Sequence, residues 1–201
     1  MSHDVTTAYS RAAGAYAAHL GSMNAVHPAD VHLVTEWAER LEGPVIDAGC
    51  GPGHWTGHLA ARGVDIRGID QVPAFVDYGR RAHPNVSFAI GNMETLQTPT
   101  DSVAGVLAWY SLIHYELDSL RVPLAEFARV LRPGGGLLIG FFHGAVAEKF
   151  DHAILTAYRW PIDALCAELK VAGFDVVETY TRTGPGYRPH GAISAHQPPA
   201  S

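Results

Sequence analysis

Apolar runs of strand length alternate with segments whose apolar residues recur at helical spacing. The strand-like runs lie at 45–47, 64–69, 86–90, 103–109, 137–142, 174–180 and 191–195. The helical patterns lie at 54–62, 73–82, 119–131 and 161–173. Strands that alternate with helices at short spacing form parallel sheets covered by helices on both faces. The pattern therefore predicts an α/β fold with a seven-stranded, mainly parallel sheet.

Two helices are expected before the first strand. Residues 6–20 place alanines and Tyr16 on one stripe, and the next helix has Pro28 in its first turn and Gly43 as its stop. Because both precede the sheet, they are an appendage to it. They form either a packing cap over one face or a lid over a ligand, with Tyr9 or Tyr16 at its underside, and the pattern leaves both interpretations open.

The chain of 201 residues is long enough for one domain with a full core. We expect a helical cap at 1–43, a core at 44–196 and a disordered tail at 197–201, which carries two prolines. The stretch 145–160 shows no clean period. Its aromatic residues suit an apolar or aromatic ligand, or a cationic amine held over a ring, and ordinary packing is the alternative.

A loop rich in glycine follows the first apolar run. The run ends in Asp47, and Gly49, Gly51 and Gly53 stand at alternate positions after it. Glycine allows positive φ and lets a ligand lie directly against the backbone. A carboxylate at the strand end and free amides at the start of the next helix predict a polar pocket at the edge of the sheet. A small, partly charged ligand is expected there.

The loop does not fit the fingerprint of dinucleotide-binding proteins. That fingerprint, G-x-G-x-x-G or G-x-G-x-x-A, meets His54 or Thr56 at its third position. The stretch 47–53 instead resembles motif I, D-x-G-x-G-x-G, of the class I S-adenosylmethionine-dependent methyltransferases. The resemblance extends over about 44–195, with five motifs in the family's order. It implies a Rossmann-like fold with an antiparallel last strand, and S-adenosylmethionine as cofactor.

The resemblance also implies which residues hold the cofactor. Asp70 ends the second strand, where a carboxylate can accept from both hydroxyls of a ribose. Asn92 stands where the family often has an acid that binds adenine, and its amide oxygen can accept the same bond. Asp47 has a loop-bracing interpretation as well, and Asn92 a turn interpretation. The expected cofactor-binding residues are Asp47, Ala48, Gly49, Cys50, Gly51, Gly53, Asp70, Gln71, Val72, Asn92, Met93, Ala108 and Trp109.

The loop after 103–109 resembles the family motif that faces the substrate. Tyr110 and His114 are expected to line the transfer site, with His143 at the end of the fifth strand. A base is needed only if the acceptor loses a proton. His114 is the leading catalytic candidate because imidazole titrates near neutral pH, and His143 is the second. Each also has an interpretation as a structural histidine. The turn at 132–136 matches a structural signature of the family.

Composition restricts the partners. The formal charge is −6 and no cluster of lysine and arginine occurs, which disfavours a nucleic-acid substrate. Cys50 and Cys166 are too few for a disulfide framework, so a reducing cytoplasm is expected. No stretch resembles a signal peptide, no apolar run approaches membrane-spanning length, and no membrane partner is expected. His54 and His58 stand one turn apart without the glutamate of a zinc motif, so no metal is expected.

These observations predict methyl transfer from S-adenosylmethionine to a small-molecule acceptor, with the acceptor atom (O, N, C or S) left open. A cofactor seat does not by itself guarantee chemistry. A non-catalytic, S-adenosylmethionine-binding regulatory module is therefore the main alternative. An NAD-dependent oxidoreductase is a weaker one.

Overall fold

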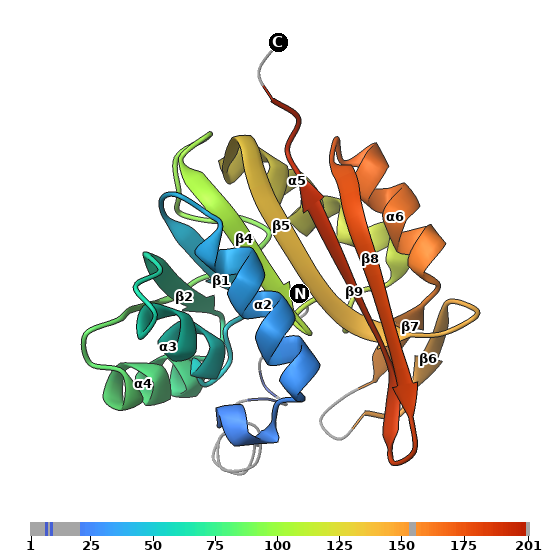
Figure 1. Ribbon diagram of the computed structural model, residues 1–201, viewed down its shortest axis with the longest axis horizontal. Coiled ribbons are helices and arrows are strands. Elements are labelled where there is room, and N and C mark those ends of the chain that lie inside the picture. Colours follow the sequence, from blue (N-terminus) through green and yellow to red (C-terminus); the bar gives the residue numbers. More distant parts are fainter. Residues whose placement is uncertain (1–6, 8, 10–20, 153–155, 200–201) are drawn as a thin grey trace.

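A nine-stranded sheet forms the centre of the computed structural model, which describes residues 7, 9, 21–152 and 156–199. Figure 1 shows its strands with helices in front and behind. The parallel strands follow the order β3 (Ser87–Ile90), β2 (Ile66–Asp70), β1 (Val45–Ala48), β4 (Val103–Trp109) and β5 (Leu131–His143). Because the strand order reverses between β1 and β4, their carboxyl ends form the natural binding crevice of such a sheet.

The last strand is inserted antiparallel, as expected. β9 (Tyr187–His196) pairs antiparallel with β5, and β8 (Asp175–Gly184) pairs antiparallel with β9 at the sheet edge. β8 and β9 extend well beyond the predicted runs and meet at a turn where Gly186 has a φ of 85°. These two strands form a long hairpin, and its lower end lies near the carboxyl ends of the parallel strands (Figure 1).

The expected number of seven strands is too low, because the stretch 145–160 contributes two more. β6 (Glu148–Phe150) and β7 (Ala157–Trp160) pair with each other, and β7 runs parallel to the last residues of β5. Strands this short, with partly exposed faces, produce no clear alternation in the sequence. The intervening residues 153–155 lie outside the described part.

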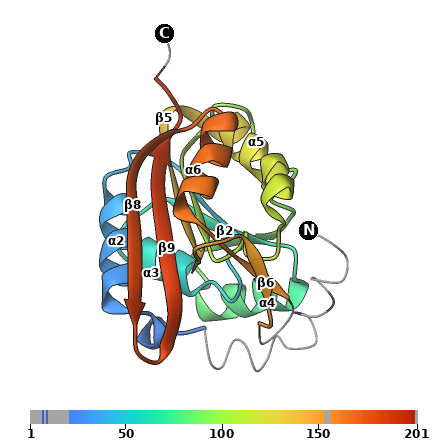
Figure 2. The same cartoon turned by 90° about the vertical axis from the view of Figure 1, so that its right-hand side faces the viewer.

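The helices form two layers. α2 (Pro28–Glu39) and α3 (His54–Ala60) share a core with β1, β2, β4 and β5. α5 (Arg121–Val130) and α6 (Ile162–Val171) contribute to the larger core on the opposite face, and Figure 2 shows the two layers edge-on. α4 (Pro73–Ala82) packs against β2 and β3. Short 3-10 helices lie at Met23–Ala25 and Leu117–Leu120.

α2 and the residues just after it pack closely against the sheet at a glycine of β4. Leu41 and Trp37 lie over Gly105 of β4, where a Cβ would come within 2.4 Å of Leu41 Cδ1. This helix is the second half of the expected cap. The first helix, expected at 6–20, falls outside the described residues except for Thr7 and Tyr9, which are both helical.

Two boundaries at the start of β5 differ from the expectation. β5 begins at Leu131, and the family-like turn at 132–136 forms an irregularity within it, because Leu131 pairs with Val103 and Gly136 pairs with Gly105. Gln197 was expected to begin the disordered tail. Instead, its backbone exchanges hydrogen bonds with Gly134 and Gly135, so it continues the antiparallel pairing of β9 with β5.

Among the described residues, no helix is both long and apolar enough to cross a membrane.

Candidate active site

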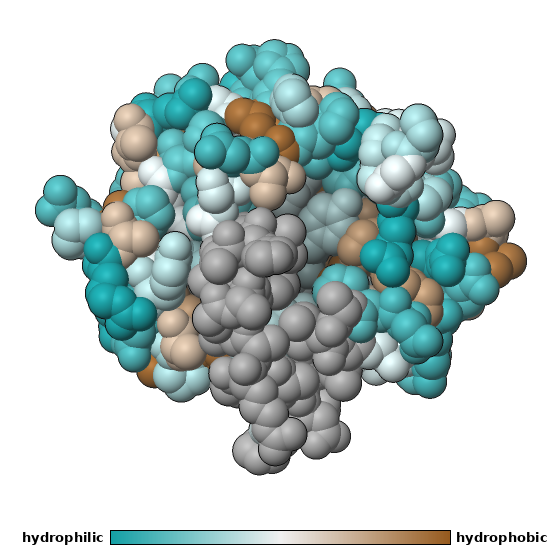
Figure 3. Space-filling view, turned by 90° about the horizontal axis from the view of Figure 1, so that it is seen from below, coloured by the Kyte–Doolittle hydropathy of each residue, from teal (hydrophilic) through white to brown (hydrophobic). Residues whose placement is uncertain are grey.

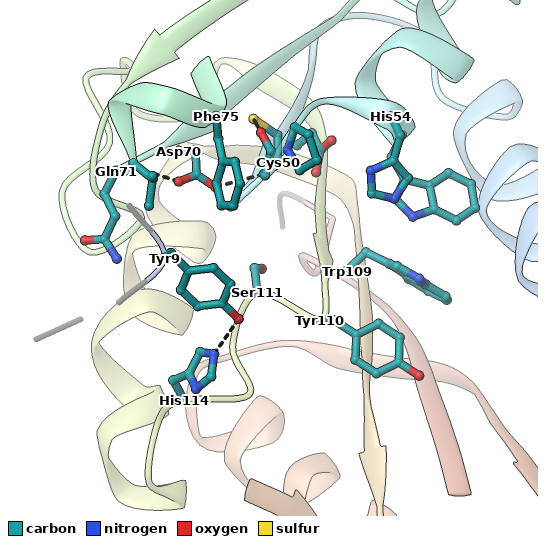
Figure 4. A pocket seen from close by; sticks show the side chains of 16 residues that line it. Tyr9, Cys50, His54, Asp70, Gln71, Phe75, Trp109, Tyr110, Ser111 and His114 are labelled. Atoms are coloured by element: carbon teal, nitrogen blue, oxygen red, sulfur yellow. Dashed lines mark hydrogen bonds between the residues drawn. The ribbon is translucent and has the colours of Figure 1, made fainter. Parts of the chain in front are cut away.

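A cavity, called here the first cavity, lies at the carboxyl ends of β1, β2 and β4 (Figure 4). The end of the molecule that carries it is seen from below in Figure 3, where the described surface is mostly hydrophilic with small, separate apolar patches. The cavity is lined by Tyr9, Asp47, Gly49, Cys50, Gly51, Pro52, His54, Trp55, Asp70, Gln71, Val72, Phe75, Trp109, Tyr110, Ser111 and His114. Most of the expected site residues are therefore brought together.

Asn92 and Met93 line a smaller adjoining cavity. It shares Gly49, Asp70 and Gln71 with the first cavity. Asn92 Oδ1 also accepts a hydrogen bond of 3.0 Å from the backbone amide of Glu94. This contact is the one expected of a turn residue.

Four expected residues line neither cavity. Ala48 and Ala108 are fully buried in the sheet, where they belong to the main core. Gly53 serves packing, because a Cβ there would lie 2.5 Å from the ring of Phe88. His143 lies at the end of β5, where its backbone pairs with β7 instead of facing β4. These four residues therefore do not contact the space in which a ligand of the two cavities would lie.

The glycine loop provides space and not free amides. The amides of Gly49 and Cys50 donate to the carbonyl of Ile69 at 2.7 and 3.1 Å, and that of Gly51 donates to Asp70 Oδ2 at 2.8 Å. The free amides were expected at the start of the next helix, α3, and these three amides precede it. Gly51, with a φ of 53°, has no atom within 4 Å of the place where a Cβ would stand. A ligand can approach the backbone there.

The two acids have different surroundings. Asp70 accepts amide hydrogen bonds from Gly51 and Val72, both at 2.8 Å, which orient its carboxylate, and burial raises its pKa. Asp47 accepts a hydrogen bond of 2.7 Å from the hydroxyl of Thr56. Burial raises the pKa of Asp47 to about 7; the Thr56 hydrogen bond opposes this shift, and the nearby charge of Asp70 adds to it. A cationic ligand group beside Asp47 would favour its ionised form.

Tyr9 and His114 meet across the cavity (Figure 4). The Tyr9 hydroxyl lies 2.8 Å from His114 Nε2, and His114 Nδ1 lies 2.8 Å from the carbonyl of Thr156. Because a carbonyl only accepts, Nδ1 carries the proton and Nε2 accepts from Tyr9. Both ring nitrogens are thus engaged, and burial lowers the pKa of His114. Tyr9 also packs edge-on against Phe75, with 5.9 Å between ring centroids.

Ser111 was not among the expected residues. Its hydroxyl is buried and has no hydrogen-bond partner among the described residues, although it lines the first cavity. A buried hydroxyl without a partner is costly unless a ligand or water completes it. This orphaned atom, with the open space at Gly51, fits a polar ligand such as S-adenosylmethionine. The sequence signal was its place in the loop directly after Tyr110.

A second cavity adjoins the first and shares Trp55, Trp109, Tyr110 and His54 with it. Its other lining residues are Ala25, Val26, His27, Asp30, Ile113, Phe142, His152, Arg182, Gly186, Tyr187, Arg188, Pro189 and His190. They come from the start of α2, the ends of β4 and β5, and the β8–β9 hairpin. Sequence reasoning missed this cavity, because no local motif links residues that are so distant along the chain.

Among the described residues, no group of three or more histidines, cysteines, aspartates or glutamates could hold a metal ion.

Comparison with known proteins identifies a domain within the chain. Residues 45–135 match a family described as a methyltransferase domain. Malonyl-[acyl-carrier protein] O-methyltransferase of Serratia marcescens is 30% identical over 157 residues, which make up 74% of this chain and 56% of that protein. The corresponding protein of Salmonella typhimurium is 31% identical over 131 residues, or 65% of this chain and 50% of that protein. The chain thus spans about half the length of these relatives.

Solved structures share the fold. An S-adenosylmethionine-dependent methyltransferase of Methanosarcina mazei has a TM-score of 0.74 at 16% identity, over 87% of this chain and 99% of that one. The 1,6-didemethyltoxoflavin-N1-methyltransferase of Burkholderia thailandensis, solved with 1,6-didemethyltoxoflavin and S-adenosylhomocysteine, has a TM-score of 0.67 at 21% identity. That match covers 96% of this chain and 79% of the other. The Rossmann-like fold is thereby confirmed.

Proposed function

Because this chain belongs to the class I S-adenosylmethionine-dependent methyltransferases, with S-adenosylmethionine as their cofactor, we propose that it transfers a methyl group to a small-molecule acceptor. The bound cofactor supplies a methyl group on a cationic sulfur. The protein's part is to position two molecules and to exclude water between them. The observation that carries the proposal is the first cavity, where Asp70, the open space at Gly51 and the unpartnered hydroxyl of Ser111 converge.

The roles of the cavity residues follow from their chemistry. Asp70 retains lone pairs beyond the two amide bonds and can accept from the hydroxyls of a ribose. Asp47 is placed to favour a cationic amine, and Ser111 can bond a polar atom beside Gly49. Gln71 and Val72, with Asn92 and Met93 across the adjoining cavity, supply the walls for a flat base.

The second cavity supplies a place for the acceptor. It opens from the first at Trp109 and Tyr110, so a molecule held there meets the cofactor cavity at that boundary. This arrangement favours catalysis over a purely regulatory cofactor-binding role. The relatives are named as O-methyltransferases, which favours oxygen as the acceptor atom.

Location and partners are part of the same proposal. Cys50 and Cys166 are both free thiols, which fits a reducing cytoplasm. The formal charge of −6 fits a small-molecule acceptor better than a nucleic acid. The domain division, with a helical cap at 1–43 on a core at 44–196, also remains a proposal.

Calorimetry with S-adenosylhomocysteine tests the cofactor site. The wild-type protein is expected to bind S-adenosylhomocysteine and not NAD. Asp70→Ala removes an acceptor of two ribose hydrogen bonds, each worth about 1–3 kcal/mol when one partner is charged, so affinity should fall at least about tenfold. Asp77→Ala, which removes an exposed carboxylate on α4, is the matched control and should bind normally. Binding of NAD alone would contradict the proposed function.

Transfer of a labelled methyl group tests the activity. The assay uses phenols, carboxylates, amines and thiols as acceptors, because the acceptor atom is open. Transfer to at least one class is expected. If no class is methylated while S-adenosylhomocysteine binds tightly, the result contradicts the proposed activity and favours the regulatory, non-catalytic alternative.

A further inference from the structure

We propose that Tyr110, His190 and Asp30 form a proton relay that takes the proton from a hydroxyl group as the hydroxyl oxygen is methylated. The inference rests on the proposed function and specifies its acceptor class. It goes beyond the sequence prediction, which placed a base at His114 and did not consider His190 or Asp30.

The three side chains are connected through their polar atoms. The Tyr110 hydroxyl is hydrogen-bonded to His190 Nδ1. His190 Nε2 lies 3.5 Å from Asp30 Oδ1, and Arg182 Nη2 lies 2.7 Å from both oxygens of Asp30. The chain of contacts thus joins the end of β4, the β8–β9 hairpin and the first turn of α2.

The relay begins where the two cavities meet and ends in a buried environment. Tyr110 lines both cavities, whereas His190 and Asp30 line only the second. His190 is 4% exposed and Asp30 is 8% exposed. In Figure 4 the Tyr110 hydroxyl points away from Tyr9 and His114, and its partner His190 lines the second cavity. The hydroxyl is therefore directed to the place proposed for the acceptor.

The backbone of Tyr110 is strained in a way that serves this position. Its φ is 57°, a left-handed conformation that costs a bulky residue free energy. Its ring is held by neighbouring rings, at 4.8 Å from Phe142 and 5.4 Å from His190 between centroids. Such strain is concentrated at functional sites, where the surroundings enforce it.

The contacts define where the protons lie. Asp30, paired with Arg182, is an acceptor for the Nε2 proton of His190. His190 Nδ1 is then free to accept from Tyr110. The charged and titratable groups facing His190 are Asp30, Arg182 and His27, besides Tyr110. Burial lowers the pKa of His190 to about 4, Asp30 opposes the shift, and Arg182 and His27 add to it, so the ring is neutral at pH 7 and can accept a proton.

The proton transfer balances without any further reactant. The acceptor oxygen forms a bond to the methyl carbon while the carbon–sulfur bond breaks and its electron pair stays on sulfur. The acceptor's proton passes to the Tyr110 oxygen as the Tyr110 proton passes to His190 Nδ1. The imidazolium is stabilised beside Asp30 and later releases its proton to solvent. Burial raises the pKa of Tyr110 and so disfavours its phenolate, and Tyr110 therefore relays the proton and does not store charge.

The arrangement selects an acceptor class. A hydroxyl or phenol must lose a proton on methylation, whereas a carboxylate is already ionised at neutral pH and needs no base. The aromatic side chains of Trp109, Phe142 and Tyr187 line the second cavity and suit a flat, apolar body. His114 is less suited to the role of base, because its Nδ1 proton faces the neutral carbonyl of Thr156, whereas the Nε2 proton of His190 faces the carboxylate of Asp30. We therefore assign a phenol-like hydroxyl as the acceptor.

The test measures how methyl transfer to phenol, catechol and 4-nitrophenol depends on pH. The wild-type rate should be nearly level between about pH 6 and pH 8, because the relay accepts the proton at every pH in that interval. Tyr110→Phe and His190→Gln should lower the rate with phenol and catechol about 100-fold at neutral pH, and should lower it less with the more acidic 4-nitrophenol. In both variants the rate should then rise about tenfold per pH unit below the phenol's own pKa, since only the ionised acceptor reacts. Tyr115→Phe is the control, because its buried hydroxyl donates to Glu94 and lines neither cavity.

A second measurement needs no turnover. Nitrogen NMR of the His190 ring in the wild-type protein should show the Nε2–H tautomer, with an Nδ1 signal that shifts in Tyr110→Phe. The opposite tautomer would overturn the relay, as would an equal loss of rate at every pH, which a structural role predicts. Failure of all three phenols to react, with S-adenosylhomocysteine bound, would also overturn it and leave cofactor binding intact. Absence of S-adenosylhomocysteine binding would instead contradict the proposed function itself.

Discussion

Gly51 and Gly53 both have left-handed backbone conformations, but their surroundings differ. Both have positive φ, but a Cβ at Gly51 meets open space, whereas one at Gly53 would lie 2.5 Å from Phe88. Gly51→Ala should cost about 1 kcal/mol of stability through backbone strain and strongly weaken S-adenosylhomocysteine binding. Gly53→Ala should add about 1–3 kcal/mol of overpacking to that strain. Urea unfolding and calorimetry separate the two effects. Equal losses of affinity at matched stability would contradict the distinction.

Residues of the site differ in how visible they are in the sequence. Asp70 and Gly51 could be predicted because each belongs to a local motif whose spacing reflects a strand and a loop. Ser111 lies beside such a motif but has no distinctive residue type. His190 could not be predicted, since its role depends on Asp30, which is brought to it only by the packing of α2 against the hairpin. The lining of the first cavity was thus largely predictable from local motifs, and the lining of the second was not.

Packing between α2 and β4 offers a test of how the cap is held. Gly105→Ala should lower the free energy of unfolding by about 1–3 kcal/mol, because the new methyl group meets Leu41 Cδ1. Adding Leu41→Ala removes the obstructing atom. The double variant should therefore be more stable than the sum of the two single changes predicts, with a coupling of at least about 0.5 kcal/mol. Strict additivity in urea unfolding would show that Leu41 is not the atom in the way.

Secondary structure was predictable where the pattern was strong and the element was long. The helix at 73–82 and the strand at 103–109 have the predicted boundaries, because proline starts the one and a continuous apolar run forms the other. β6 and β7 were missed, since their short, half-exposed strands depend on pairing with each other and with β5. The irregularity in β5 likewise arises from its partners, which accommodate extra residues without ending the strand.

The pH dependence of stability combines opposing contributions from buried groups. Asp47 has its pKa raised to about 7, so its contribution is fully present below about pH 4 and is lost as the pH rises to 7. His54, His152 and His190 have pKa values lowered to about 4. Their contribution is present above about pH 6.5 and is lost as the pH falls toward 4.

Asp47→Asn isolates the first contribution. The variant should gain stability relative to the wild-type protein between about pH 4 and about pH 7, by an amount on the order of 4 kcal/mol at 1.4 kcal/mol per pKa unit. Urea unfolding at both ends of that interval measures the difference. Parallel stability curves for the two proteins would mean that Asp47 is ionised in the folded state across the interval.

The β8–β9 hairpin has an evolutionary implication. It lines the second cavity through Arg182, Tyr187 and His190, and it does not line the first. The glycine loop and Asp70 come from the opposite half of the sheet. Under the proposed function, mutations in this one hairpin would change which molecule is methylated and would leave the residues around Gly51 and Asp70 unaltered. A lineage with this architecture can diversify its chemistry by remodelling a single peripheral segment, and grafting hairpins between relatives would be the natural route for engineering it.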